Sequence, residues 1–264
     1  MDAGFSNPRK SAAGAPSRFL QRQYKDYRNL DKNIEQQKAI TASILLEMHT
    51  HSRLPTSTPA DRAAADLAIG AYFFAMRSCE YDHVTGPRRT KHLLLRNLRF
   101  FKNNKTMALD DPNLASATAI SITFEFQKTD IQNETVHQHT TDLPVLCPVR
   151  RWASIATRIL SYPGCNKDSL VSTVVSSDKR KLVTGAFLSS KLQAAAGRIG
   201  EDTLGFPPSD IGTHSIRSGG AMAMYLAGVP VLPSCSSEDG PPTHSSGISA
   251  VRSSSLAPVY RSGW

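Results

Sequence analysis

The chain has 264 residues, enough for one large domain, and 40% of them are hydrophobic, which suits a packed core. It has no apolar run near the roughly 18 residues of a membrane-spanning helix, and its N-terminus lacks the apolar core of a secretory signal. The net charge of +9 favours a polyanionic partner, most simply nucleic acid. The four cysteines have neither metal-ligand nor disulfide spacing. We therefore expect reduced thiols in a nuclear or otherwise intracellular protein with no membrane partner.

The first third of the chain predicts two helices after a polar leader. Residues 1–36 are basic and poor in aliphatic side chains, so we expect them to be disordered or loosely helical. Apolar residues then recur at helical spacing over about 38–49. Thr58, Pro59 and Asp61 are typical of a helix start. The helix that follows is apolar on most sides, which predicts a central position.

The middle and end of the chain predict a small sheet among further helices. Residues 93–101, 119–126 and 135–141 have strand composition, with a polar hairpin tip at 127–134. Helical patterns follow at 149–160, at 184–196 and, capped by Thr213, over 213–226. We therefore predict an α+β fold, mainly helical, with a three-stranded antiparallel sheet, in one domain over 37–232. Residues 233–264 are rich in serine and proline, which predicts a disordered tail.

His214 and Arg217 are the first candidate site residues. They lie three positions apart on the predicted helix, so both side chains leave one face, where a proton donor beside a bidentate cation suits a phosphate. The alternative is a surface helix with an incidental histidine and arginine. Arg77 follows an apolar helix, either as a functional cation or as a terminal charge that faces solvent or pairs with Glu80. Lys128 lies at the hairpin tip, where lysine is also ordinary.

Taken in order, these motifs resemble the tyrosine recombinase (phage integrase) family. The resemblance rests on residues 74–80 (FAMRSCE), on 128–130 (KTD) and on 212–219 (GTHSIRSG). The segments 146–149 (LCPV) and 227–230 (AGVP) are similar to the eukaryotic mobile-element branch, which includes Crypton-like and retroelement-borne integrases. The resemblance covers about residues 38–232.

The resemblance implies a chemistry for each matched residue. Arg77 and Arg217 would clamp the scissile phosphate and offset charge in the transition state. Lys128 would protonate the departing 5′-oxygen, and His214 would assist proton transfer or hold the phosphate. Glu80 would orient Arg77. The reaction would be DNA integration and site-specific recombination through a 3′-phosphotyrosine, with double-stranded DNA as partner and no metal or other cofactor.

Basic residues between and beyond these motifs predict a DNA-facing surface. Backbone phosphates would take most of the contacts, which gives salt-sensitive and weakly selective binding. The alternative for any one cluster is a solvated loop that happens to be basic. The residues are Arg88, Arg89, Lys91, Arg96, Arg99, Lys102, Lys105, Arg150, Arg151, Lys179, Arg180 and Lys181.

The nucleophile that the family requires has no counterpart in place. Family members carry Trp or His about 22 residues after the second arginine and the nucleophilic Tyr about 8 or 9 residues further. Those places hold residues 239–240 (DG) and 247–248 (GI) here, and Tyr260 lies well beyond them, in the serine- and proline-rich tail. Codons exist for residues 233–250 that, read one base earlier, encode a helix pair with Trp and Tyr at the required positions. We therefore predict that the chain is frameshifted after about Leu232 and is defective in strand cleavage.

Three alternatives stay open from the sequence. The chain could be an active recombinase that takes its tyrosine from Tyr260 or from a partner chain, a non-enzymatic DNA-binding or regulatory module on the same scaffold, or an unrelated basic α+β domain. The family implies tetramers that exchange a C-terminal helix, and that helix is the part this chain is predicted to lack. We therefore expect a monomer. We also expect low DNA affinity at physiological salt, because the N-terminal helical domain of the family is not recognisable here.

Overall fold

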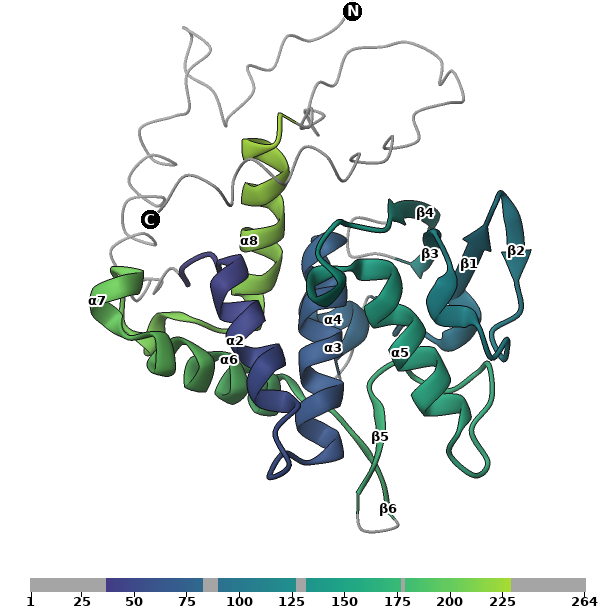
Figure 1. Ribbon diagram of the computed structural model, residues 1–264, viewed down its shortest axis with the longest axis horizontal. Helices are drawn as coiled ribbons and strands as arrows, with labels where there is room; N and C mark the ends of the chain where they lie inside the picture. The colour runs from purple at the N-terminus through teal and green to yellow at the C-terminus, as the bar shows by residue number, and fades with distance from the viewer. Residues whose placement is uncertain (1–36, 83–89, 127–131, 177–178, 229–264) are drawn as a thin grey trace, which may run out of the picture. The chain divides into compact units, whose positions relative to one another are not determined.

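The computed structural model describes residues 37–82, 90–126, 132–176 and 179–228. Over these residues it is an α+β fold with seven α-helices and two antiparallel sheets, as predicted for the class (Figure 1). The predictions for residues 1–36 and 233–264 lie outside the described residues. The same holds for Arg88, Arg89, Lys128 and Tyr260.

Helices α2 (Ala42–Ser52) and α3 (Pro59–Phe73) form the first part of the core. Thr58 and Asp61 form a reciprocal capping box at the start of α3, as the sequence indicated. Helix α2 begins later than predicted, because the preceding backbone is held extended by long-range hydrogen bonds. Lys38 N donates to the carbonyl oxygen of Asp210, and Ile40 N donates to that of Ser215.

The main sheet has four strands, one more than predicted. They are β1 (Leu98–Lys102), β2 (Lys105–Met107), β3 (Ala119–Phe126) and β4 (Gln132–His139), all antiparallel in the order β2-β1-β3-β4. The additional strand β2 follows a turn at Asn103 and Asn104, both at positive φ, a conformation that asparagine tolerates. Residues 95–97 are a 3₁₀ turn rather than the predicted strand, because Leu95 N and Arg96 N donate to the carbonyls of Ser169 and Lys167.

The second half of the chain is mainly helical. Its helices are α5 (Pro148–Leu160), α6 (Gly185–Ile199), α7 (Glu201–Leu204) and α8 (Thr213–Leu226), and a four-residue α4 (Ser78–Tyr81) follows α3. A hairpin of β5 (Thr173–Ser176) and β6 (Lys179–Leu182), which the sequence analysis did not predict, lies between α5 and α6. In Figure 1 this hairpin extends from the end of the fold opposite the C-terminal end of α8.

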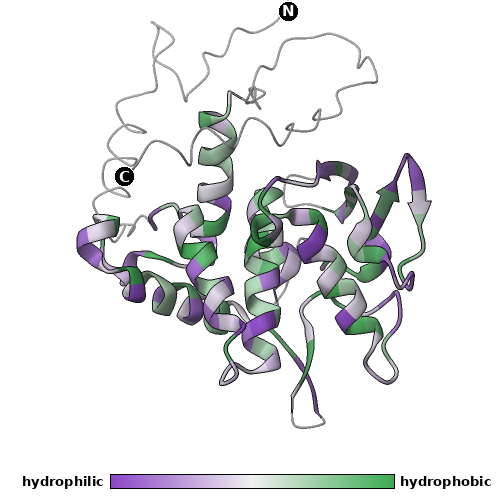
Figure 2. Cartoon of the chain, in the orientation of Figure 1, coloured by the Kyte–Doolittle hydropathy of each residue, from purple (hydrophilic) through white to green (hydrophobic). Residues whose placement is uncertain are grey.

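The central position predicted for α3 is confirmed. Helix α3 packs against α2, α5, α6 and α8, and hydrophobic residues recur along it in Figure 2. The fully buried Trp152 of α5 lies against Gly70, where a Cβ would come within 2.9 Å of the indole ring. Its ring also meets Phe74 edge to face, with the centroids 6.4 Å apart. A bulkier residue at position 70 would force these two helices apart.

Two consecutive glycines let α8 approach the core closely. A Cβ on Gly219 would collide with the backbone carbonyl of Ile40, and one on Gly220 would collide with that of Tyr72. Helix α8 is thereby seated against both the segment before α2 and the C-terminal end of α3. This seating places the first turns of α8 beside the residues that follow α3.

Candidate phosphate-binding site

The site begins where α3 ends. Met76 N donates to the carbonyl of Ala71 and Ala75 N to that of Tyr72, a Schellman arrangement that closes the helix. Ala75 occupies the left-handed position of this motif, with φ of 44°, although glycine is the usual residue there. The chain turns sharply as a result, and Arg77 becomes the residue that caps the short helix α4.

Glu80 holds Arg77 through both its backbone and its side chain. One carboxylate oxygen accepts from Arg77 N at 2.8 Å, and the other pairs with Arg77 Nη1 at 3.4 Å. Glu80 is only 4% exposed. Burial raises the pKa of Glu80, and the nearby charges of Arg77 and Arg217 act in the opposite direction. The spacing of three residues predicted this contact between Glu80 and Arg77.

Arg217 reaches the same place from α8. Its Nη1 donates to the carbonyl oxygen of Ala75 at 2.6 Å across 142 positions of sequence. Burial lowers the pKa of Arg217, the positive charge of Arg77 lowers it further, and Glu80 opposes both effects. Two arginines from distant parts of the chain therefore lie within electrostatic range of each other around one buried carboxylate. Such a cluster is suited to bind an anion with two charged oxygens.

His214 lies in the first turn of α8, where its side chain is exposed. The helix starts at Thr213 with Gly212 as N-cap, so the predicted capping by Thr213 is wrong. Ser215 Oγ instead accepts a hydrogen bond from Gly212 N at 3.1 Å. His214 thus stands one turn before Arg217 on the same helix, as its sequence spacing predicted, and its ring is accessible from solvent.

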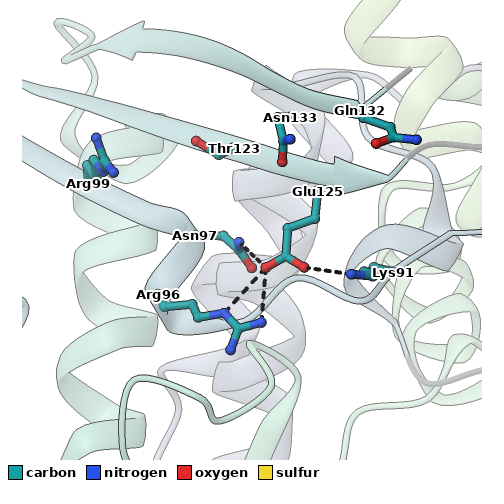
Figure 3. Close-up of a pocket in the computed structure, with 8 residues that line it drawn as sticks. All are labelled: Lys91, Arg96, Asn97, Arg99, Thr123, Glu125, Gln132 and Asn133. Atoms are coloured by element: carbon teal, nitrogen blue, oxygen red, sulfur yellow. Dashed lines mark hydrogen bonds and ion pairs between the residues drawn. The ribbon is translucent and has the colours of Figure 1, made fainter. Parts of the chain in front are cut away.

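A polar pocket of about 420 Å³ lies on the main sheet, and neither Arg77 nor Arg217 lines it (Figure 3). Figure 3 shows Glu125 at its centre, where Asn97, Arg96 and Lys91 converge on the carboxylate. The hydrogen bond from Asn97 and those from Arg96 and Lys91 lower the pKa of Glu125. Arg96 also pairs with Asp168 at 2.8 Å. The charges predicted to face DNA at Lys91 and Arg96 are therefore partly compensated within the protein.

Arg151, which the sequence analysis assigned to the DNA-facing surface, is mostly buried. Its side chain is 13% exposed and pairs with Asp66 at 3.1 Å. Asp66, 1% exposed, also accepts from Arg53 and Ser154. His49 lies beside Arg151, and burial together with the charges of Arg151 and Arg53 lowers the pKa of His49 to about 4. This buried network links α2, α3 and α5. Arg151 therefore stabilises the fold, and its predicted place on the DNA-facing surface is wrong.

The other predicted basic residues of the described chain lie at the surface. Arg99, Arg150 and Lys105 are exposed, and Lys102 donates to Ser116 Oγ at 3.0 Å. Lys179, Arg180 and Lys181 are exposed on β6, where Arg180 donates to the carbonyl of Pro163. These surface positions are compatible with phosphate contacts.

Glu134 is a residue near the site that the sequence analysis did not single out. It was assigned to the hairpin tip, whereas strand β4 begins at Gln132 and includes it. The alternation of Glu134, Val136 and Gln138 toward the inner face was the available signal. If the predicted strand had begun at Gln132 rather than at Thr135, the alternation of side chains would have placed Glu134 on the same face as Gln138.

The described residues contain no group of three or more histidine, cysteine or acidic side chains arranged to hold a metal ion. No helix among them is long and apolar enough to cross a membrane. The chain matches no protein-family model, no curated protein and no solved structure in the comparisons made.

Proposed function

We propose that this chain is a DNA-binding domain of the tyrosine-recombinase type, from a protein of DNA integration and site-specific recombination. The observation that carries the proposal is the meeting of Arg77, Glu80 and Arg217. Two guanidinium groups from separate helices can each donate to a non-bridging oxygen of one phosphodiester. Glu80 fixes the first of them by its bonds to backbone and side chain. The net charge of +9 and the exposed basic residues add contacts to flanking phosphates.

The chemistry of such a site is attack on phosphorus with displacement of the 5′-oxygen. A tyrosine oxygen forms the new bond to phosphorus while the bond to the 5′-oxygen breaks, and the two arginines offset the negative charge that grows on the equatorial oxygens. His214, accessible at the start of α8, would hold the phosphate or transfer a proton. Lys128, outside the described residues, would protonate the leaving oxygen.

We further propose that this chain binds DNA without cleaving it. The positions at which the family carries its nucleophile hold glycine and isoleucine. This observation also favours a second candidate function, a non-enzymatic DNA-binding or regulatory module that uses the same scaffold. We propose a nuclear monomer in either case. In the candidate regulatory role, duplex DNA would still contact Arg77 and Arg217.

Binding to a labelled duplex, measured by fluorescence anisotropy in low salt, tests the DNA-binding proposal. Arg77→Ala and Arg217→Ala should each weaken binding roughly tenfold, since each removes a charged phosphate contact. Arg198→Ala is the matched control, because Arg198 pairs with Glu47 on the surface of α6 and should matter little. Unchanged binding in both site variants would refute the proposal.

Incubation with a nicked duplex, followed by denaturing electrophoresis, tests the cleavage defect. We expect no covalent protein–DNA adduct from the present chain. An adduct that disappears in Tyr260→Phe would show an active enzyme instead. Sequencing the gene across codons 230–264 tests the frameshift, and codons that cannot encode Trp and Tyr in the earlier frame would end that explanation.

A further inference from the structure

Glu134 faces the end of α3 from the main sheet. Successive strand residues point to opposite faces, so Glu134 shares one face of β4 with Val136 and Gln138. Gln138 is buried, and its Nε2 donates to the carbonyl oxygen of Phe73 at 2.8 Å. That carbonyl belongs to Phe73, the last residue of α3, two residues before Ala75. This face of β4 is therefore turned toward the segment that carries the arginine site.

The local exposure of β4 agrees with this placement. Glu134 is partly buried, whereas Asn133 and Thr135 on either side of it are exposed. Its register partner on β3 is Phe124, which is 7% exposed. A partly buried carboxylate is stabilised by hydrogen bonds or by a nearby positive charge.

Arg217 is one positive charge that interacts with Glu134. Burial lowers the pKa of Arg217 and Arg77 lowers it further, while carboxylates that include Glu80 and Glu134 oppose the shift. Glu134 thus lies within electrostatic range of Arg217, although the two come from β4 and α8. Among the residues that the structure describes, the cluster contains two guanidinium groups and two carboxylates, whose formal charges cancel when all are ionised.

We propose that Glu134 is an internal counter-charge. In the DNA-free protein its carboxylate offsets the positive charge of Arg77 and Arg217, and this weakens phosphodiester binding. The proposal rests on the function proposed above, that this site binds phosphate. A phosphate entering a cluster with cancelled charges leaves an excess of negative charge, whereas without Glu134 it would neutralise a cation. Glu134 would therefore lower the affinity of the site for weakly binding anions. A phosphate would bind there only when the rest of the duplex is bound.

Glu134 is better suited to this role than Glu80. Glu80 is almost fully buried and bonded to the backbone of Arg77, so its loss would disorder the site itself. Glu134 lies near the start of β4, next to Asn133 at positive φ, and keeps part of its surface in solvent. Its carboxylate can rotate toward solvent when a phosphate arrives.

The test is Glu134→Gln in the full chain, measured by anisotropy on a random-sequence duplex and by the rise in Tm with added sulfate. We expect duplex binding to tighten at least about fivefold and the sulfate-induced rise in Tm to be larger than in the wild type. Glu201→Gln is the matched control: Glu201 is exposed on α7, and the charge change is the same. That control should leave both readouts within about twofold of the wild type.

A second background separates a local effect from a global one. In Arg217→Ala, the added Glu134→Gln should give no gain, because the cation it releases is absent. Unchanged or weaker binding in Glu134→Gln, or a gain that persists without Arg217, would overturn the inference. If Glu134→Gln fails to fold, Glu134→Thr supplies a neutral residue suited to a strand. The proposed function fails separately, if Arg77→Ala and Arg217→Ala bind DNA as well as the wild type does.

Discussion

Arg217 Nη1 donates a 2.6 Å hydrogen bond to the carbonyl oxygen of Ala75, a residue held at φ of 44°. The bond joins α8 to the turn between α3 and α4, two residues before Arg77. A left-handed alanine is strained, and the turn it makes exposes its carbonyl to the guanidinium. The position of the second arginine thus depends on how the chain leaves α3.

Replacing Ala75 with glycine should relieve this strain. A left-handed conformation costs a non-glycine residue roughly 1–2 kcal/mol, and glycine's greater freedom in the unfolded chain cancels part of the gain. We expect Ala75→Gly to raise the free energy of unfolding by about 0.5–1 kcal/mol, measured in urea. Ala68→Gly, inside α3, should lower it by about 1 kcal/mol or more. Equal losses of unfolding free energy in Ala75→Gly and Ala68→Gly would show that Ala75 is not strained.

Gly220 should not tolerate a side chain. Its Cβ would collide with the backbone carbonyl of Tyr72, which cannot move without shifting α3. We expect Gly220→Ala to lower the free energy of unfolding by about 2–3 kcal/mol. Gly197→Ala is the matched control, because its Cβ would meet only Pro208 Cγ at 3.8 Å. As a helix-interior glycine, Gly197 should gain up to about 1 kcal/mol from alanine. Gains in both variants would show that α8 is not seated as described.

Asp66 should be essential to stability. It is 1% exposed and accepts from Arg53, Arg151 and Ser154, so its neutralisation leaves partly buried cations without their carboxylate. We expect Asp66→Asn to lower the free energy of unfolding by roughly 3 kcal/mol or more. Glu47→Gln removes a surface pair with Arg198 and should change it by less than about 0.5 kcal/mol. Similar small effects from both variants would contradict the buried network.

His49 should make the fold sensitive to acid. Its pKa is about 4 in the folded chain and 6.5 as a free group, so the folded state binds fewer protons between these values. The contribution of neutral His49 to the free energy of unfolding is therefore complete above pH 6.5 and is lost as pH falls from there through about 4. Between pH 7 and pH 4.5 the wild type should lose about 1–2 kcal/mol more than His49→Gln, measured by urea unfolding, since partial exposure screens the charge. Parallel pH profiles would refute this.

Elements with local signals were predictable, and elements set by long-range contacts were not. The start of α3 follows from Thr58 and Asp61, and β3 from a run of β-branched and aromatic residues. Strand β2 has only three residues, too few for an alternating pattern. Strand β6 is basic and short, so its sequence resembles a loop. The late start of α2 depends on carbonyls near α8, far along the chain.

The same distinction applies to the site. The contact between Arg77 and Glu80 spans three positions and was predictable from spacing alone. The approach of Arg217 to Ala75 is a tertiary contact that no sequence spacing predicted. The family resemblance implied only that Arg217 and Arg77 share one phosphate. Arg151 was misplaced because its partner Asp66 lies 85 positions away, on a helix whose pattern is otherwise apolar. Charge counting alone cannot separate a buried arginine from a surface one.

Exposed and buried arginines should therefore separate in a combined binding and stability experiment. Arg99 is exposed on β1, so Arg99→Ala should weaken duplex binding about three- to tenfold, reduce the salt dependence by about one phosphate contact, and leave Tm unchanged. Arg151→Ala removes a partner of Asp66 and should lower the free energy of unfolding by roughly 3 kcal/mol, with little change in binding by the folded fraction. Anisotropy between 50 and 200 mM salt and urea unfolding of both variants measure these effects, at salt concentrations over which phosphate contacts weaken steeply. If Arg151→Ala weakens DNA binding and leaves the free energy of unfolding unchanged, Arg151 belongs to the DNA-facing surface after all.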